Sequence, residues 1–367
     1  MLRKTLNPLA LLIVVGLLAA CAAPAATPTQ AVDNPTASPT EASASPTAEA
    51  KPPIKLTLGA YTTPREAYGK LLPLFAAQWK EKTGQEVTFE ESYLGSGAQS
   101  RAIVEGFEAD IAALSLDGDI DRIAKAGLIT HDWHTLPYSG FVSTSVVTFA
   151  VRKGNPKNIR DWADLAQPGL EILTPDPKTS GGAQWNILAL YGATIRGKVQ
   201  GVSAGDEAAA SEFLKSVLKN VTVFDKGARE SITNYEKGVG DVAITYENEV
   251  LVGQQKGQDY ELVIPSSTIL IENPVAIVDT YVDKHGTREV AEAFVQFLFT
   301  PEAQTIFAQY GLRSLDPAVA KTTADQYPPV TDLFTIGDQF GGWQEAAPKY
   351  FSETGIYTQA IADVQGQ

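Results

Sequence analysis

Apolar and polar positions along residues 55–126 alternate between the period of a strand and the period of a helix. Short β-like runs predict strands, and the longer segments between them have apolar residues at helical spacing. The predicted strands are 55–60, 86–91 and 110–116, and the predicted helices are 66–83, 98–109 and 119–126. A regular succession of strands and helices is typical of an α/β fold.

A second set of elements follows over residues 145–310, without an internal repeat. Strand-like runs are 145–152, 170–174, 221–224, 241–246, 260–264 and 275–282. Between them lie the short segment 161–165, a helix that opens at Ser180, and the helices 207–219, 230–237, 288–299 and 301–310. Two α/β lobes joined by two or more crossovers are the simplest arrangement, and the pattern after Leu312 is too irregular to place.

The N-terminus predicts an exported lipoprotein. Arg3 and Lys4 precede a 12-residue apolar stretch, residues 9–20, which is shorter than the roughly 20 residues of a membrane-spanning helix. The small residues before Cys21 resemble a bacterial lipobox, in which this cysteine becomes the lipidated first residue. We expect residues 1–21 to be the signal and the chain to be anchored through Cys21 at the outer face of the cytoplasmic membrane or in a periplasm. Cys21 is the only cysteine, so an intramolecular disulfide is excluded.

Composition separates a tether from a folded part. Residues 22–53 are mostly Ala, Pro, Thr and Ser, too poor in large apolar side chains to fold, and we expect a disordered tether. Residues 54–367 are long enough for two packed domains. Basic and acidic side chains balance within residues 1–53, so the folded part keeps the whole formal charge of −14. This acidity argues against a nucleic-acid partner and requires any anion site to use short-range donors.

Residues 174–186, with the sequence TPDPKTSGGAQWN, predict a strand exit, a turn and the start of a helix. The first N–H groups of a helix lack intrahelical partners and lie at the positive end of its dipole, so they favour an anion. Ser180 adds a hydroxyl donor, and Gly181 and Gly182 let a ligand approach bare backbone. An ordinary serine cap on an amphipathic helix is the alternative interpretation.

Three further turns connect a predicted strand to a predicted helix. They are residues 61–66, which include Thr62, residues 95–97, which include Ser96, and residues 227–229, which include Ala228. Ligands of open α/β sheets bind at the carboxyl ends of the strands. We therefore expect the four turns, divided between the lobes, to face one cleft, although each alone is compatible with a routine loop.

Residues 174–186, 151–157 with 161–162, 240–249, and 333–336 with 340–343 carry a resemblance that extends over essentially all of residues 54–367. They resemble the bacterial sulfate-binding proteins that supply ABC sulfate importers. The resemblance implies a two-lobed, type II periplasmic-binding-protein-like fold that closes over a desolvated sulfate dianion. It also implies a permease as partner, no cofactor and no enzymatic activity, and we expect a monomer. We place lobe 1 at 54–149 and about 265–325, lobe 2 at about 150–264, and a C-terminal segment at about 326–367.

The resemblance also implies a set of ligand donors. These would be the backbone at Thr62 and Ser96, Ser180 with the amides of Gly181 and Gly182, the amide of Ala228, and the side chain of Tyr246. Two positions depart from the family pattern. Thr62 stands where the family has Asp, and the phenol of Tyr246 stands where the family has an indole donor.

A shell of donors alone selects against protonated oxyanions. Sulfate presents only acceptors, whereas phosphate usually keeps a proton that would face another donor, a mismatch of roughly 1–3 kcal/mol. We therefore expect a preference for sulfate over phosphate. Thiosulfate, molybdate, tungstate and selenate also lack a proton, so binding of another tetrahedral oxyanion remains an alternative.

Other chemistry is less well supported by the sequence. His131 and His134 are three residues apart, but the only other histidine is His285, so a zinc site would need carboxylates. Residues 117–128 lack the Gly and Glu of a calcium loop and favour an acidic helix start. An exported hydrolase using Ser96 or Ser180 lacks a recognisable histidine partner and remains a minority alternative, as does an adhesive or scaffolding lipoprotein. Lys226 and Arg229 stand beside a proposed anion site. They could steer a ligand or pair with nearby carboxylates, and surface pairing is the preferred interpretation.

Overall fold

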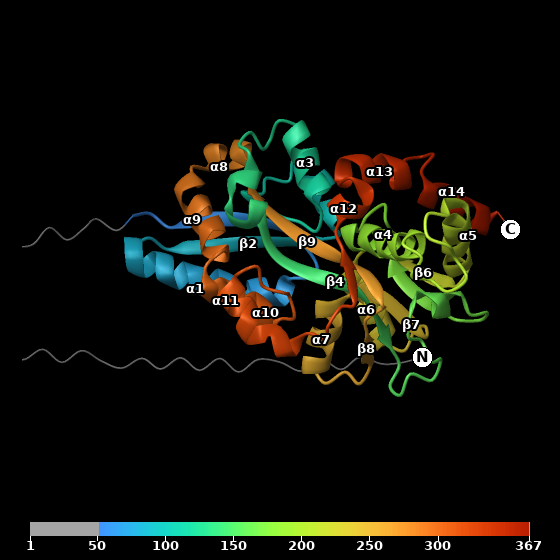
Figure 1. Cartoon of the computed structure of the whole chain (residues 1–367). Helices are drawn as coiled ribbons and strands as arrows, with labels where there is room; N and C mark the ends of the chain where they lie inside the picture. Colours follow the sequence, from blue (N-terminus) through green and yellow to red (C-terminus); the bar gives the residue numbers. More distant parts are fainter. Residues whose placement is uncertain (1–50, 367) are drawn as a thin grey trace, which may run out of the picture. The chain divides into compact units, whose positions relative to one another are not determined.

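The computed structural model describes residues 51–366 of the chain (Figure 1). The predicted signal, the lipidation of Cys21 and the tether as far as residue 50 lie outside the described residues. Residues 51–53 lead without regular structure into the first strand. No helix in the described range is both long and apolar enough to cross a bilayer.

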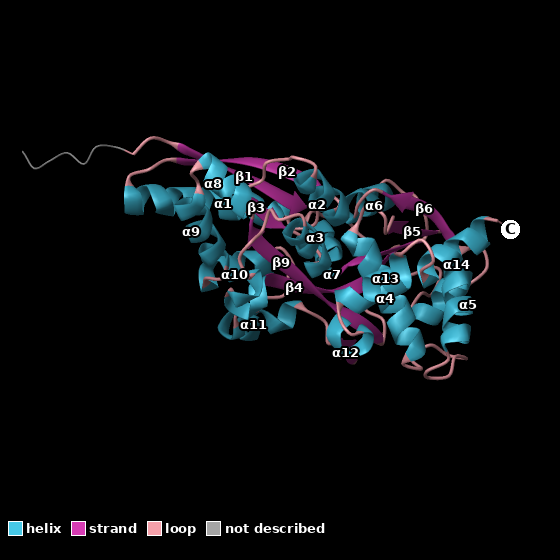
Figure 2. Cartoon of the chain, turned by 90° about the horizontal axis from the view of Figure 1, so that it is seen from above, coloured by secondary structure: helices cyan, strands magenta, loops and turns pink. Residues whose placement is uncertain are grey.

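Ten strands form the sheet of the described residues. They are β1 (Ile54–Tyr61), β2 (Val87–Leu94), β3 (Ile111–Ala113), β4 (Phe141–Val151), β5 (Ile172–Pro175), β6 (Val221–Asp225), β7 (Val242–Tyr246), β8 (Glu261–Val263), β9 (Ser267–Ile277) and β10 (Asp332–Phe334). The order is β2-β1-β3-β9-β4-β7-β5-β6, with β8 beside β4 and β10 beside β9. The neighbours β1–β2 and β1–β3 are parallel, as are β5–β6 and β5–β7. The long antiparallel pair β4 and β9 stands between these two parallel groups (Figure 2).

Helices follow most of the strands. In chain order they are α1 (Arg65–Thr83), α2 (Ser96–Val104), α3 (Asp117–Lys125), α4 (Gly181–Ile195), α5 (Glu207–Leu218), α6 (Ala228–Glu236), α7 (Glu247–Gln255), α8 (Asp279–His285), α9 (Arg288–Leu298), α10 (Pro301–Gln309), α11 (Pro317–Thr323), α12 (Ile336–Phe340), α13 (Trp343–Phe351) and α14 (Ile356–Gln365). Short 3-10 turns are Trp133–Thr135, Pro137–Gly140, Trp162–Ala166 and Ala324–Gln326. We call the part built on β1, β2 and β3 the first half, and the part built on β5, β6 and β7 the second half.

Each half has its own hydrophobic core. In the first half, α1 buries one apolar face that includes Phe75, whose ring centroid is 5.1 Å from that of Phe294 in α9. In the second half, α4 lies inside the core, and every residue from Gly181 to Thr194 except Gln184 is buried. A helix that is apolar on all sides must be covered on all sides. The expected amphipathic helix at Ser180 is therefore a fully enclosed one.

Several regions differ from the sequence prediction, among them α7 and residues 267–274 of β9, for which no element was predicted. The predicted strand 275–282 is the end of β9 followed by α8, because the carboxylate of Asp279 accepts bonds from the N–H groups of Thr130 and His131 and fixes a helix start there. The unplaced region after Leu312 forms β10 and the helices α11 to α14. Helices α13 and α14 complete the second core, and Trp343 packs edge to face on Trp185 at 4.7 Å between ring centroids.

Candidate functional site

The residues predicted to bind a ligand all lie where a parallel strand of either half gives way to a helix. Thr62 follows β1, Ser96 opens α2, Ser180 caps α4, Ala228 opens α6, and Tyr246 ends β7 and precedes α7. All of them, together with Gly181 and Gly182, are buried. The turns therefore form an enclosed part of the described structure.

Hydrogen bonds join the turns, both across the two halves and within the second half. The N–H of Ala98 in α2 donates to the carbonyl of Thr179 at 3.1 Å, and the Thr179 hydroxyl donates to the carbonyl of Lys226 at 2.9 Å. A Cβ atom on Gly95 would lie 2.5 Å from the Thr179 carbonyl oxygen and 2.8 Å from that of Lys226. Only glycine permits this approach. The two halves are thus in direct contact around the turns.

The double glycine after Ser180 is required by equally close packing. A Cβ atom on Gly181 would lie 2.9 Å from the hydroxyl oxygen of Ser115. One on Gly182 would lie 2.7 Å from Cε2 of Tyr246 and 3.4 Å from Cβ of Ala228. The first turn of α4 therefore presents bare backbone to side chains from three other turns.

The two serines of the predicted set differ in how their hydroxyls are used. Ser96 Oγ donates to Asp119 Oδ2 at 2.6 Å and accepts from the N–H of Ser115 at 2.9 Å. The Ser96 hydroxyl is therefore already used within the protein. The group of Ser96 that can donate to a ligand is its backbone N–H, which stands at the first helical position and lacks an intrahelical acceptor. Ser180 Oγ accepts a long bond, 3.4 Å, from the N–H of Ala183 and keeps its proton for another partner.

Tyr246 is paired with a residue that the sequence analysis missed. Its Oη lies 2.6 Å from Ser115 Oγ, and both side chains are buried. Burial raises the pKa of the Tyr246 phenol, so it remains protonated at neutral pH. Ser115 lies near the end of the predicted strand 110–116. The signal that marks it is that this strand leads into a predicted helix, as do the strands that precede the other four turns.

Arg229 connects the two halves beside these turns. It donates to Glu66 of α1 at 2.5 and 2.9 Å and to the carbonyl of Thr63 at 3.2 Å. Its Nε lies 2.9 Å from the carboxylate of Glu249, which is buried. Burial lowers the pKa of Arg229, but the carboxylates of Glu249 and Glu66 raise it by more. The expected surface pairing of Arg229 is wrong, because its partners are largely buried.

The histidines do not support the metal or hydrolase interpretations. His131 pairs with Asp279, His134 pairs with Asp132, and His285 lies between Glu108 and Asp110. All three are thus engaged away from Ser96 and Ser180. Over residues 51–366, no group of three or more His, Cys, Asp or Glu side chains is arranged to hold a metal ion. The acidic run at 117–121 begins α3, as the sequence predicts.

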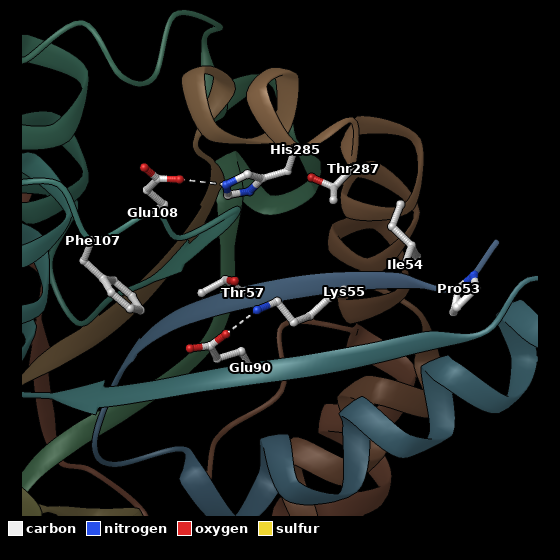
Figure 3. A pocket seen from close by; sticks show the side chains of 9 residues that line it. All are labelled: Pro53, Ile54, Lys55, Thr57, Glu90, Phe107, Glu108, His285 and Thr287. Carbon is white, nitrogen blue, oxygen red and sulfur yellow. Dashed lines mark hydrogen bonds and ion pairs between the residues drawn. The ribbon is translucent and has the colours of Figure 1, made fainter.

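A pocket of about 580 Å³ lies at the opposite, amino end of β1 (Figure 3). Its wall includes Ile54 and Thr57 of β1 and the side chains of Glu108 and His285. Lys55 of β1 and Glu90 of β2, which form an ion pair of 2.6 Å, also line it. The charged side chains that line the pocket are thus already paired with one another.

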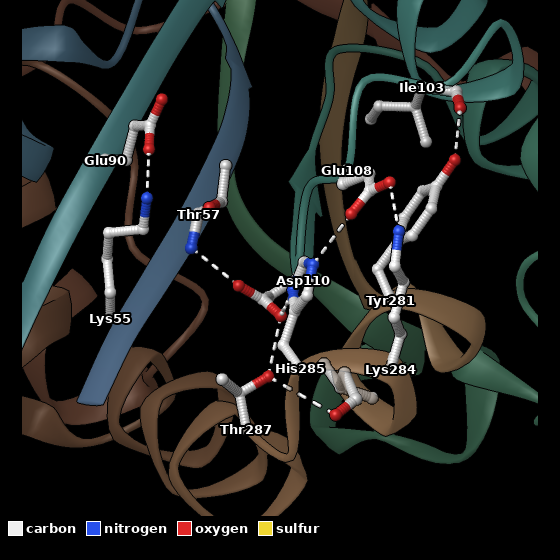
Figure 4. A network of polar contacts seen from close by, with 11 residues as sticks. Lys55, Thr57, Glu90, Ile103, Glu108, Asp110, Tyr281, Lys284, His285 and Thr287 are labelled. Atoms are coloured by element: carbon white, nitrogen blue, oxygen red, sulfur yellow. Dashed lines mark hydrogen bonds and ion pairs between the residues drawn. The ribbon is translucent and has the colours of Figure 1, made fainter. Parts of the chain in front are cut away.

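A polar network fixes the amino end (Figure 4). The fully buried carboxylate of Asp110 accepts from the N–H of Thr57 at 2.7 Å, from the Thr287 hydroxyl at 2.6 Å and from Nδ1 of His285 at 2.9 Å. His285 Nε2 bonds to Glu108 at 3.0 Å. Burial lowers the pKa of His285, but its bonds to Glu108 and Asp110 outweigh this and raise it.

Known proteins are similar to this chain in both architecture and sequence. A family model described as bacterial extracellular solute-binding protein matches residues 56–313. A sulfate-binding protein of Synechococcus elongatus is 46% identical over 86% of this chain and 89% of its own length. A thiosulfate-binding protein of Escherichia coli is 38% identical over 84% of this chain and 91% of its own length. Among solved structures, the sulfate-binding protein SubI from Mycobacterium tuberculosis superposes with a TM-score of 0.74 at 38% identity, over 82% of this chain and 100% of that chain.

These likenesses confirm the two-lobed, type II periplasmic-binding-protein-like fold. A periplasmic thiamin-binding protein shares the fold alone, with a TM-score of 0.63 at 15% identity. The relatives are named as binding proteins, and their family is not enzymatic. The chain belongs to the bacterial extracellular solute-binding proteins, in the family that contains the sulfate-binding proteins.

Proposed function

We propose that this chain captures sulfate outside the cytoplasm and delivers it to an ABC importer. The observation that carries the proposal is the buried cluster of helix starts. Gly182 lies against Ala228, the turn of Ser96 contacts Thr179 just before α4, and Gly227 lies beside Thr62. Relatives named as sulfate-binding proteins, up to 46% identical among those compared, support the same ligand. The importer permease follows as partner from the family.

The donors would be the residues named from the sequence. They are the amides at Thr62, Ser96, Gly181, Gly182 and Ala228, and the hydroxyls of Ser180 and Tyr246. Amides at helix starts stabilise an anion without a cation in contact. Arg229, the cation next to Ala228, is held by Glu66 and Glu249, which supports a ligand bound by neutral donors.

We propose that the halves are lobes that close over the anion. Lobe 1 would comprise residues 54–149 and about 265–325, lobe 2 about 150–264, and residues from about 326 would pack on them. The contacts of Gly95 and Ala98 with Thr179 support this, because they hold the turns of the two halves together. The strands β4 and β9, which run between the halves, would contain the hinges.

We also propose that the chain is a monomer held at the membrane by a lipid on Cys21. The small residues before Cys21 and the short apolar stretch 9–20 support this. Mass spectrometry of the mature N-terminus tests it. A diacylated cysteine is expected at the first position, and an unmodified N-terminus elsewhere would contradict the anchor.

Calorimetric titration of the full-length chain with sulfate, thiosulfate, molybdate and phosphate, at one pH and ionic strength, tests the ligand. We expect sulfate to bind at least about tenfold more tightly than phosphate, because a protonated oxygen meets mainly donors. Thiosulfate is the second candidate, since a thiosulfate-binding relative is 38% identical. Silence towards all four anions would contradict the proposal.

Ligand binding also stabilises the folded chain. A ligand that binds only the folded state at about 100 times its Kd adds about 2.7 kcal/mol. A thermal scan with and without sulfate therefore gives an independent readout. Replacement of Ser180 by alanine should weaken sulfate binding by about 1–3 kcal/mol, since it removes a donor to a charged group.

A further inference from the structure

The hydroxyls of Ser115 and Tyr246 form a bond between the two halves, and either oxygen can be the donor. The bond is 2.6 Å long. The backbone of Ser115 is fixed on both sides, because its N–H donates to Ser96 Oγ at 2.9 Å and its carbonyl accepts from Nε1 of Trp185 at 3.1 Å. Ser115 is fully buried and Tyr246 is 1% exposed. The pair therefore has a defined position, away from bulk solvent.

Both side chains lie against the first turn of α4. Ser115 Oγ is 2.9 Å from where a Cβ of Gly181 would be, and Cε2 of Tyr246 is 2.7 Å from where a Cβ of Gly182 would be. These glycines carry two of the amides expected to donate to the oxyanion. The hydroxyl pair thus lies beside those amides.

The hydroxyl pair of Ser115 and Tyr246 offers its surroundings both a donor and an acceptor. Two hydroxyls carry two protons, and their mutual bond uses one of them. The other proton is free to donate to a neighbour, while the hydroxyl that donates within the pair keeps a lone pair free to accept. If the bond reverses, the roles exchange. A backbone N–H can only donate, so the pair adds an acceptor that the amides of the cluster lack.

We propose that Ser115 and Tyr246 together form part of the oxyanion shell and set how far it excludes oxyanions that carry a proton. The proposal rests on the proposed function and extends it to a residue and a specificity. With sulfate the pair donates one O–H. With hydrogen phosphate it reverses and accepts the P–OH, so phosphate binds more weakly than sulfate but measurably.

The test compares sulfate and hydrogen phosphate binding by the full-length chain and by Ser115→Ala, Tyr246→Phe and the double variant. Titration gives the sulfate affinity, and competition against sulfate gives the phosphate affinity. Ser145→Ala and Tyr235→Phe are matched controls, because Ser145 is fully buried in β4 and Tyr235 lies in another hydrophobic cluster. Thermal unfolding of each variant shows that it is folded.

We expect Ser115→Ala to weaken sulfate binding by less than about fivefold. The loss of phosphate affinity should be about ten times larger than the loss of sulfate affinity, so the ratio of sulfate affinity to phosphate affinity rises. The two single changes should be non-additive, since each breaks the same pair. The controls should leave both affinities within about twofold.

Equal loss of both affinities would overturn the proposal, because it would show a pair that only positions the turns. Unchanged affinities, or no measurable phosphate binding by the unchanged chain, would overturn it as well. Each of these results leaves sulfate capture intact. Failure of the unchanged chain to bind sulfate would instead contradict the proposed function and, with it, this inference.

Discussion

At the amino end of β1 the buried carboxylate of Asp110 accepts bonds from three different residues, whereas at the start of α3, beside the turns, Asp117 has one oxygen with no partner in the described part of the chain. Burial, and then the charge of Asp121, raises the pKa of Asp117 to about 6. A buried charge stabilises a fold only when its bonds are satisfied. The satisfied carboxylate of Asp110 therefore stabilises the fold, whereas the incompletely satisfied carboxylate of Asp117 lowers its stability when charged.

The largest effect is expected from Asp110→Asn. An amide would turn an N–H₂ towards one of the donors from Thr57, Thr287 or His285, so we expect a loss of about 2–4 kcal/mol in the free energy of unfolding. Sulfate affinity should stay within about twofold, because the change lies at the far end of β1. Chemical denaturation and titration measure the two quantities. Asp283→Asn, which alters an exposed partner of Arg288, is the control, and an equal loss there would contradict the assignment.

Gly182→Ala should weaken sulfate binding and change stability less, which is the reverse of the result expected for Asp110→Asn. The new Cβ would lie 2.7 Å from Cε2 of Tyr246 and would displace the turn that carries the proposed donors. We expect sulfate affinity to fall by about 1.5–3 kcal/mol, as for the loss of a hydrogen bond to a charged group. The unfolding free energy should change less, because alanine favours a helix over glycine by about 1 kcal/mol. Gly69→Ala in α1, where a Cβ meets nothing within 4 Å, is the matched control. Unchanged sulfate affinity in Gly182→Ala would place the ligand elsewhere.

Asp117→Asn should stabilise the chain at neutral pH. The folded-state pKa of about 6 lies above the ordinary value of 3.8, so the fold favours the protonated carboxyl. The contribution of Asp117 to the free energy of unfolding is then greatest below about pH 4 and is lost as the pH rises through 6. The amide removes this loss, and we expect a gain of about 1–2 kcal/mol at pH 7.5 that vanishes near pH 4. Thermal scans across this range measure it. A variant whose pH profile matches that of the unchanged chain would contradict the assignment.

The smallest effect concerns His285. Its pKa is raised above the ordinary 6.5, so its contribution to stability is complete below that pH and is lost as the pH rises through the folded-state value. Part of the ring is exposed, which limits the effect to about 0.5–1 kcal/mol. Comparison of His285→Gln with the unchanged chain between pH 6 and 9 measures it. A difference that grows towards pH 9 would reverse the expected sign.

The sequence predicted the turns better than the elements around them. Gly95, Gly181, Gly182 and Gly227 mark the turns because bare backbone is needed there, and such residues are visible in a sequence. Ser115 was missed because its role comes from Tyr246, which is 131 positions away. The helices after Leu312 were missed because they are short, α13 contains Pro348, and Gly341 and Gly342 with positive φ interrupt the pattern. Packing on other helices, α11 on α10, α13 on α4 and α14 on α5, stabilises them, and not local preference.

The bond from the indole of Trp185 to the carbonyl of Ser115 has an optical consequence. It joins α4 of the second half to the segment that follows β3 in the first, and the ring is fully buried against Trp343. Any movement that separates the halves must break this bond and change the surroundings of an indole. The intrinsic fluorescence of the unlabelled chain should therefore report whether the halves are together or apart, without an attached dye.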